Sequence, residues 1–149
     1  MAIIWRDALS VGNAGVDTDH RYLLCLINTV ELALRVEESS DALVPALKQL
    51  KLYTQEHFAR EEKLMAALRY ARIDQHRIAH GELIEQFDHA VEPVMKLRVE
   101  PSAAAAEAIS DATREEIIAV LRHWLLDHII KEDMLLKPLF AGIPRDYQP

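Results

Sequence analysis

The sequence predicts an all-α protein, an up-down-up-down four-helix bundle preceded by an N-terminal arm. Four long segments carry apolar residues at helical spacing, and no segment alternates apolar and polar residues as a strand would. The connections between these segments are short, which makes consecutive helices antiparallel neighbours. The chain has 149 residues, only four glycines and no stretch rich in proline, glycine or serine, so we expect one domain over residues 1–149.

The first half of the chain contains the arm and two helices. The arm covers about residues 1–16, and the first helix covers about residues 17–37 with Asp17 as its expected N-cap. The second helix covers about residues 41–69, and Pro45 leaves its exact start open because proline is tolerated only near the beginning of a helix.

The second half of the chain contains the other two helices. Asp74 is the expected cap of the third helix, which covers about residues 74–98 and is expected to kink or end near Pro93. The fourth helix covers about residues 103–136 and is expected to stop around Pro138. It begins with an alanine run that favours a helix and carries no functional information.

Composition excludes several classes of function. The formal net charge is −7 and no basic stripe is present, which argues against a nucleic-acid partner. The N-terminal "MAIIWRDALS" lacks a basic leader followed by a long apolar run, and no stretch of about 18 uncharged apolar residues occurs, so we expect a cytoplasmic protein without membrane insertion. The single cysteine, Cys25, excludes an internal disulfide, and we predict that it is a small buried hydrophobe.

Histidines are distributed over all four predicted helices. Two pairs are spaced by four residues, His57 with Glu61 and His76 with His80, so each pair shares one helix face. Such pairs are, taken alone, more often exposed than buried. Together with one histidine on the first helix and one on the fourth, however, they can converge in the bundle interior: His20, His57, His76, His80 and His128.

The two remaining histidines act as an internal control. His89 follows His80 by nine residues, about 180° around an ideal helix, and therefore points away from the face that carries His76 and His80. His123 precedes His128 by five residues and also lies off its face. We predict that both are solvated.

The donor types indicate which metals suit such a cluster. Neutral imidazole and carboxylate suit iron, zinc, copper or manganese, while the absence of nearby cysteine argues against a structural zinc or iron–sulfur site. Five imidazoles and two acids exceed what one ion uses, whereas two ions bridged by carboxylates would employ them all. No Glu-x-x-His occurs in the chain, which weighs against a ferritin-like oxidase.

These motifs together resemble the hemerythrins, and specifically the single-domain bacteriohemerythrins. The resemblance runs from a tryptophan and "VG" in the arm through "VDTDH", "HFAREEKLM", "HRIAH" and "WLLDHIIKED". It implies two iron ions, one held by three histidines and one by two, with two carboxylates bridging them beside an oxo or hydroxo group. Carried onto this sequence, the three histidines are His76, His80 and His128, the two are His20 and His57, and the bridges are Glu61 and Asp133.

For the second bridging carboxylate, helical spacing and the family resemblance select different residues. Asp133 follows His128 by five residues, about 140° around a helix, whereas Glu132 at four residues lies closer to the face of His128. Spacing alone selects Glu132, and the resemblance selects Asp133. We follow the resemblance and expect the bridging position or a local helix distortion to accommodate the offset.

The resemblance also implies a function. It implies reversible dioxygen binding at the iron that keeps an open position, for oxygen storage or delivery to an oxygen-using enzyme, rather than catalysis. A dry pocket is needed, and we expect its walls to be Phe58, Trp124, Leu125 and Ile129, which would equally serve as bundle core. Two alternatives stay open: a di-iron peroxidase, nitric oxide reductase or oxidase, and a sensor of oxygen, nitric oxide or redox state that acts on a partner protein.

Overall fold

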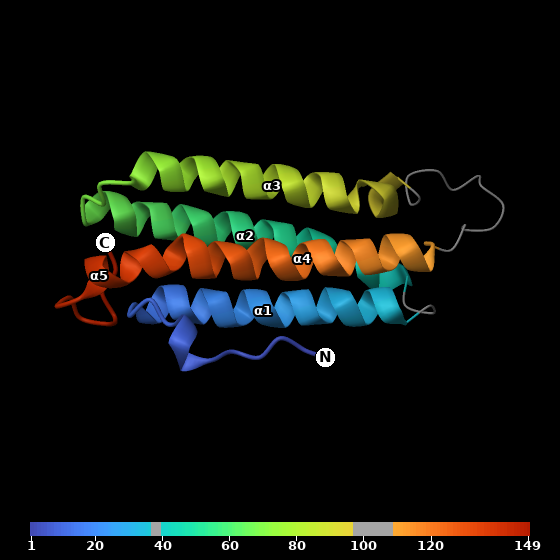
Figure 1. The fold of residues 1–149 in the computed structure, drawn as a ribbon, viewed down its shortest axis with the longest axis horizontal. Helices are drawn as coiled ribbons and strands as arrows, with labels where there is room; N and C mark the ends of the chain where they lie inside the picture. Colours follow the sequence, from blue (N-terminus) through green and yellow to red (C-terminus); the bar gives the residue numbers. More distant parts are fainter. Residues whose placement is uncertain (37–39, 97–108) are drawn as a thin grey trace.

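The computed structural model describes residues 1–36, 40–96 and 109–149. Within them the long helices lie side by side, with α1 and α3 running opposite to α2 and α4 (Figure 1). The predicted all-α, up-down-up-down four-helix bundle is confirmed, and no strand occurs in the described residues. The elements in chain order are η1 (Asp7–Leu9), α1 (Ala14–Arg35), α2 (Ser40–Ala67), α3 (Ile73–Lys96), α4 (Asp111–Lys131), η3 (Asp133–Leu136) and α5 (Lys137–Phe140).

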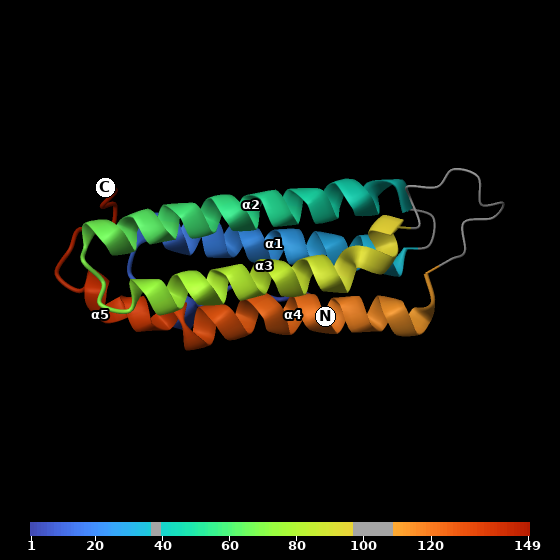
Figure 2. The ribbon, with the colours of Figure 1, turned by 90° about the horizontal axis from the view of Figure 1, so that it is seen from above.

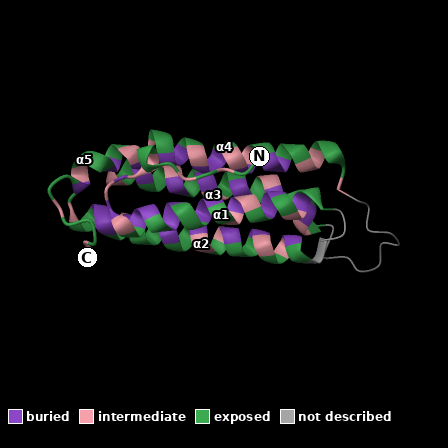
Figure 3. Cartoon of the chain, turned by 90° about the horizontal axis from the view of Figure 1, so that it is seen from below, coloured by how far each residue is buried: buried purple, intermediate pink, exposed green. Residues whose placement is uncertain are grey.

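The four long helices form a closed ring of neighbours. Contacts join α1 to α2, α2 to α3, α3 to α4, and α4 back to α1. Figure 2 shows the bundle from above, with α5 at the end where α1 and α3 begin. Buried residues recur along each of the long helices, between exposed ones (Figure 3). None of the described helices is both long and apolar enough to cross a membrane.

The start of α1 differs from the prediction. The helix begins at Ala14, and its N-cap is Asn13, whose side-chain oxygen accepts a hydrogen bond from the Val16 amide at 3.1 Å. Asp17, the predicted cap, lies inside the first turn and is fully buried. Its carboxylate instead accepts hydrogen bonds from the Ser10 hydroxyl at 2.5 Å and the Val11 amide at 2.9 Å. Asp17 therefore fastens the arm to the helix, and the arm ends earlier than expected.

The ends of α2 and α3 also correct the sequence boundaries. α2 ends at Ala67 because Arg69 adopts a positive φ of 55° and the Tyr70 amide donates back to the Met65 carbonyl at 2.9 Å. α3 begins at Ile73, so the predicted cap Asp74 is already a helical residue. It also continues past Pro93 to Lys96, and the expected end at 98 lies outside the described residues, as does the expected end of the first helix at 37.

The fourth helix is shorter than predicted at both ends. Ser110 is the N-cap of α4, with its hydroxyl accepting from the Thr113 amide at 3.1 Å, so Ile109 and Ser110 are not helical. The expected start at 103 and the alanine run at 103–106 lie outside the described residues. α4 ends at Lys131 rather than near residue 136, and the chain continues as η3 and α5.

Cys25 is exposed, which overturns the prediction that it is buried. The neighbouring residues Leu23, Leu24 and Ile27 form the inward face of α1. Cys25 falls between them on the outer face because the helix turns by about 100° per residue. The position of Cys25 in the helical pattern therefore predicts its exposure better than the apolar character of its side chain does.

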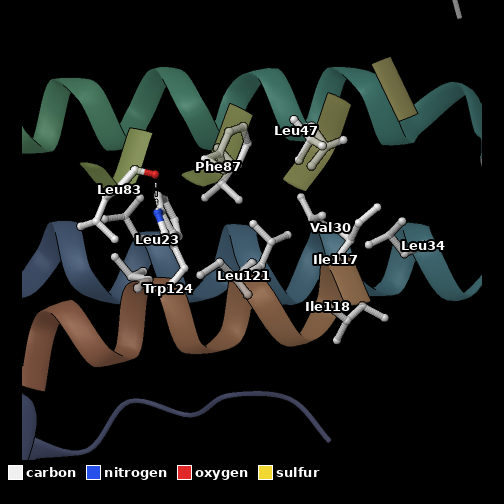
Figure 4. Packing of buried hydrophobic residues seen from close by; sticks show 14 of the residues in the cluster. Leu23, Val30, Leu34, Leu47, Leu83, Phe87, Ile117, Ile118, Leu121 and Trp124 are labelled. Carbon is white, nitrogen blue, oxygen red and sulfur yellow. Dashed lines mark hydrogen bonds between the residues drawn. The ribbon is translucent and has the colours of Figure 1, made fainter. Parts of the chain in front are cut away.

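Among the described residues, the bundle interior contains two apolar clusters. The larger one runs along the four long helices, and Figure 4 shows part of it, including Leu23, Phe87, Leu121 and Trp124. The indole N–H of Trp124 donates to the Leu83 carbonyl at 2.7 Å, so this buried polar atom is satisfied. The smaller cluster lies at the α5 end and consists of Val11, Val16, Leu64, Met65, Leu136 and Phe140.

Candidate metal centre

Seven polar side chains form a buried layer near the α5 end of the bundle. Each long helix contributes at least one of them, and η3 contributes the last. All are at most 5% exposed, and both carboxylates are fully buried. These residues, called the ligand layer below, are His20 from α1, His57 and Glu61 from α2, His76 and His80 from α3, His128 from α4, and Asp133 from η3.

The helical period explains why the layer lies between the two apolar clusters. On α1, Val16 of the smaller cluster lies one turn before His20, and Leu23 of the larger cluster lies one turn after it. On α2, Leu64 and Met65 of the smaller cluster follow Glu61 by one turn. The ligand layer therefore continues the inward stripes of the helices and is covered by apolar side chains on both sides.

The two carboxylates lie among the imidazoles. Asp133 oxygens are 3.1 Å from His20 Nε2, 3.2 Å from His76 Nε2 and 2.9 Å from His128 Nε2. The Oε2 atom of Glu61 is 3.2 Å from Nε2 of both His76 and His80. Each acid thus contacts ring nitrogens from at least two residues, and Asp133 joins three different helices.

The ligand atoms fall into two overlapping groups. Within each group the atoms all lie within 4.8 Å of one another, close enough for a single metal ion. The five-member group consists of Glu61, His76, His80, His128 and Asp133. The four-member group consists of His20, His57, Glu61 and Asp133, so the two carboxylates belong to both groups.

Unsatisfied polar atoms indicate that the layer fits metal ions. Among the described residues, eight buried nitrogen and oxygen atoms of the layer have no hydrogen-bond partner, including both carboxylate oxygens of Asp133 and Nε2 of His20, His57 and His80. Two pairs of them, His20 Nε2 with Asp133 Oδ2 and His128 Nε2 with Asp133 Oδ1, lie within ion-pair distance without hydrogen-bond geometry. Buried polar atoms without partners are costly, and a cation that accepts their lone pairs removes that cost.

The charges of the layer lead to the same conclusion. Burial would raise the pKa of Asp133 and of Glu61, but the surrounding imidazoles outweigh burial and hold both pKa values below their usual range. Burial would lower the pKa of His76, but the hydrogen bonds and charges of Asp133 and Glu61 raise it to about 10. Two ionised carboxylates without solvent contact require positive charge beside them, either imidazolium or a metal.

The break at the end of α4 places Asp133 in the layer. α4 ends at Lys131, Glu132 is its C-cap with φ −110° and ψ −53°, and η3 begins at Asp133. The change from α to 3₁₀ geometry alters the angular step, so the residue five positions after His128 enters the ligand layer while Glu132 stays partly exposed. The distortion expected from the sequence is therefore present, and Asp133 rather than Glu132 joins the cluster.

Two carboxylates outside the layer were missed by sequence reasoning. Nδ1 of His57 donates to Asp19 at 3.2 Å, and Nδ1 of His80 donates to Glu62 at 2.8 Å. Asp19 precedes His20 and Glu62 follows Glu61, so each is a direct chain neighbour of a predicted ligand. That adjacency was the available signal, but contact with the histidine of another helix depends on helix packing.

Asp19 is held by several donors besides His57. Burial would raise its pKa, but hydrogen bonds from His57, Arg60 and Tyr53 outweigh burial and keep the pKa far below its usual range. Burial and the same contact with Asp19 raise the pKa of Tyr53 to about 12. Asp19 is therefore an ionised acceptor surrounded by neutral and cationic donors.

The four predicted pocket residues are buried beside the layer. Leu125 and Ile129 are fully buried, and Phe58 and Trp124 nearly so. The Phe58 ring stacks on the His80 imidazole with a centroid distance of 3.7 Å and an interplanar angle of 8°. All four belong to the larger apolar cluster, and the Phe58 ring also lies 5.6 Å from the His57 and His128 imidazoles, centroid to centroid.

The control histidines lie apart from the layer. His89 and His123 are both exposed, as the helical angles predicted. Nδ1 of His123 donates to the Ala119 carbonyl of its own helix at 2.8 Å. Neither residue belongs to either group of ligand atoms.

Comparison with known proteins identifies the family. Residues 11–140 match the model of the hemerythrin HHE cation binding domain. The chain belongs to the hemerythrin family. Curated relatives include a bacteriohemerythrin of Pseudomonas aeruginosa, 30% identical over 131 residues that cover 88% of this chain and 76% of the relative. A bacteriohemerythrin of Clostridium acetobutylicum is 22% identical over 133 residues, which cover 87% of this chain and 95% of the relative.

Relatives of the hemerythrin type also occur outside bacteria. A hemerythrin-like protein of Naegleria fowleri is 27% identical over 133 residues, 89% of each chain. No solved structure gives a significant match. The range matched by the hemerythrin model, 11–140, includes the whole ligand layer and both carboxylates that contact it from outside.

Proposed function

We propose that this hemerythrin-family chain binds dioxygen reversibly at a non-haem di-iron site. The observation that carries the proposal is the ligand layer itself, in which two overlapping groups of ligand atoms share Glu61 and Asp133. Imidazole and carboxylate donors suit iron, and the shared acids suit two ions rather than one. Two ferrous ions, when bound, would supply the two electrons and the open coordination position that dioxygen binding requires.

In this proposal the two groups have different tasks. His76, His80 and His128 would fill the positions around one iron, and His20 and His57 would leave the other with one position fewer occupied by protein. Glu61 and Asp133 would bridge the ions, and their negative charges would offset part of the metal charge at a place where both carboxylates are fully buried. The asymmetry of five donors against four thus supports oxygen binding on the His20 and His57 side.

The residues around the layer would keep water and protons away. Phe58, Leu125 and Ile129 offer no hydrogen-bonding atoms, and the indole N–H of Trp124 is already donated to the Leu83 carbonyl. None of these side chains can therefore deliver a proton to the site. Exclusion of water and protons is what distinguishes a reversible oxygen carrier from a site that releases reduced oxygen.

The deciding experiment begins with metal analysis of protein purified without oxygen. We expect two irons per chain. Mixing the colourless reduced protein with dioxygen in a stopped-flow spectrometer should then produce visible absorption, and argon should return the colourless protein together with free oxygen. One zinc per chain and no visible absorption would overturn the iron site.

The same experiment tests the catalytic alternative, whereas the sensing alternative needs a measurement of partner binding. Oxidised protein and hydrogen peroxide at each cycle would favour a peroxidase or oxidase over a carrier. A sensor would bind oxygen or nitric oxide and change its affinity for a partner protein. Storage, delivery to an oxygen-using enzyme and a cytoplasmic location remain predictions from the sequence.

A further inference from the structure

The two groups of the ligand layer form different hydrogen bonds to side chains outside the layer. In the four-member group, Nδ1 of His57 donates to Asp19, and Nδ1 of His20 has no hydrogen-bond partner among the described residues. In the five-member group, Nδ1 of His80 donates to Glu62. Each group therefore contains a histidine that is oriented by a carboxylate which is not itself a ligand.

The carboxylate of Asp19 is shared among more donors than that of Glu62. Oδ1 of Asp19 accepts from the Tyr53 hydroxyl at 2.7 Å and from Arg60 Nη2 at 3.0 Å. Oδ2 accepts from Arg60 Nε at 2.9 Å and from His57 Nδ1 at 3.2 Å. Glu62 has one strong donor, His80, and a long contact of 3.4 Å from Arg77.

The larger number of donors on Asp19 agrees with the longer hydrogen bond that it accepts from its histidine. A carboxylate that already accepts from a guanidinium and a phenol is a weaker acceptor for an imidazole N–H, and the His57–Asp19 distance of 3.2 Å exceeds the His80–Glu62 distance of 2.8 Å. The contacts are also protected, because the Asp19 side chain is only 11% exposed. Tyr53 and Arg60 both lie on α2 with His57, so one helix presents three donors to Asp19.

We propose that Asp19 is a positioning residue of the metal centre and that Tyr53 and Arg60 set how strongly it accepts the His57 proton. Asp19 fixes the His57 ring with its proton on Nδ1, so that Nε2 faces the ligand layer as an electron-pair donor. The hydrogen bonds from Tyr53 and Arg60 to Asp19 limit the negative charge that reaches this imidazole. The inference rests on the proposed function for its effect on iron, but the proton position is a property of the chain alone.

The first test therefore uses metal-free protein. Nitrogen-15 NMR at pH 8 should place the His57 proton on Nδ1. Asp19→Asn leaves a neutral and weaker acceptor, so the Nδ1–H resonance should move upfield. Tyr53→Phe removes a competing donor from Asp19, so the same resonance should move downfield. A His57 proton on Nε2 in the wild-type protein, or shifts of equal sign in the two variants, would overturn the proposal.

The second test uses the iron-loaded protein. Asp19→Asn should raise the reduction potential, because a less anionic partner makes His57 a poorer donor to ferric iron, and should lower iron affinity about 10- to 100-fold. Tyr53→Phe should lower the potential. A purely structural role would weaken iron binding in both variants without this reversal of sign, and that result contradicts the inference.

Asp88→Asn is the matched control. Asp88 is also a carboxylate paired with a cation, Lys51 at 2.6 Å, but it is exposed and contacts no residue of the ligand layer. Its potential and iron affinity should equal those of the wild type. If the wild-type chain fails to bind iron or oxygen while the NMR shifts behave as expected, the proposed function fails and the positioning role stands.

Discussion

The larger apolar cluster and the ligand layer are neighbouring regions of one bundle interior with opposite energetic character. Both are built by the inward stripes of the same four helices, and the ligand layer adds Asp133 from η3. Burial of apolar side chains stabilises the first region by about 25 cal/mol per Å² removed from water. Burial of two carboxylates and five imidazoles destabilises the second unless each charge and lone pair finds a partner. The helical pattern alone does not decide whether a buried position contributes stability.

This contrast shows how function is placed in the fold. The ligand layer lies between two apolar clusters rather than at a surface. Burial of apolar side chains in these clusters therefore offsets the free-energy cost of burying the polar groups of the layer. The layer can therefore keep unsatisfied atoms available for metal without unfolding the bundle. Variants and conditions that act on one region but not the other test this division.

The largest expected effect is that of metal removal. Free metal at 1,000 times its dissociation constant stabilises the folded state by about 4 kcal/mol. We therefore expect iron-free protein to unfold at a clearly lower urea concentration than loaded protein, with hydrogen-exchange protection lost first around the ligand layer. Equal urea midpoints for the two forms would mean that the layer is already satisfied without metal.

Asp133→Ala is expected to have the next largest effect. Asp133 belongs to both groups of ligand atoms and contacts His20, His76 and His128, so its loss should lower iron content at both positions. Glu132→Ala, the neighbouring control, should change the free energy of unfolding by no more than about 0.5 kcal/mol. Iron analysis and urea unfolding of both variants measure the difference. A reversed ranking would reassign the bridging role to Glu132.

These two residues also show what the sequence could and could not predict. The fold followed from apolar periodicity, and spacings of four residues placed two pairs of predicted ligands, His57 with Glu61 and His76 with His80, each on one helix face. Asp133 did not follow from spacing, because its position depends on the change from α to 3₁₀ geometry at Glu132. The resemblance to a family selected it instead.

Side-chain contacts between helices could not be predicted from the sequence either. Asp19 was not predicted to hold His57, since that contact joins α1 to α2 and depends on how the helices are rotated in the bundle. Two predictions about α1, a buried Cys25 and an N-cap at Asp17, were wrong for a different reason. There the residue type was given more weight than the position in the helical repeat.

His76→Ala is expected to have a smaller effect than Asp133→Ala, because His76 belongs to only one of the two groups. We expect loss of iron from that group and partial loss of oxygen binding. His89→Ala on the same helix should keep both, since His89 is exposed. Iron per chain and the absorbance change on oxygen addition measure the outcome. Similar losses in the two variants would show that α3 is rotated differently in solution.

The smallest expected effect comes from one matched substitution at two positions of the larger apolar cluster, Leu121→Val and Leu125→Val. Both leucines are buried in the larger apolar cluster, and each variant loses one methylene, at a cost of about 1 kcal/mol in the free energy of unfolding. Iron content should be unchanged in both because neither residue is a ligand. Leu125 lies one turn before His128, however, and covers the ligand layer, whereas Leu121 lies a further turn away.

Only Leu125→Val should therefore admit water to the layer and speed autoxidation of the oxygenated protein. The decay of its visible absorption under oxygen, compared with that of Leu121→Val, measures this. The two variants share the loss of volume, so stability alone cannot explain a difference between them. Equal decay rates would mean that dryness at the site does not depend on Leu125, and that the wall of the oxygen pocket must be sought among the other residues beside His80 and His128.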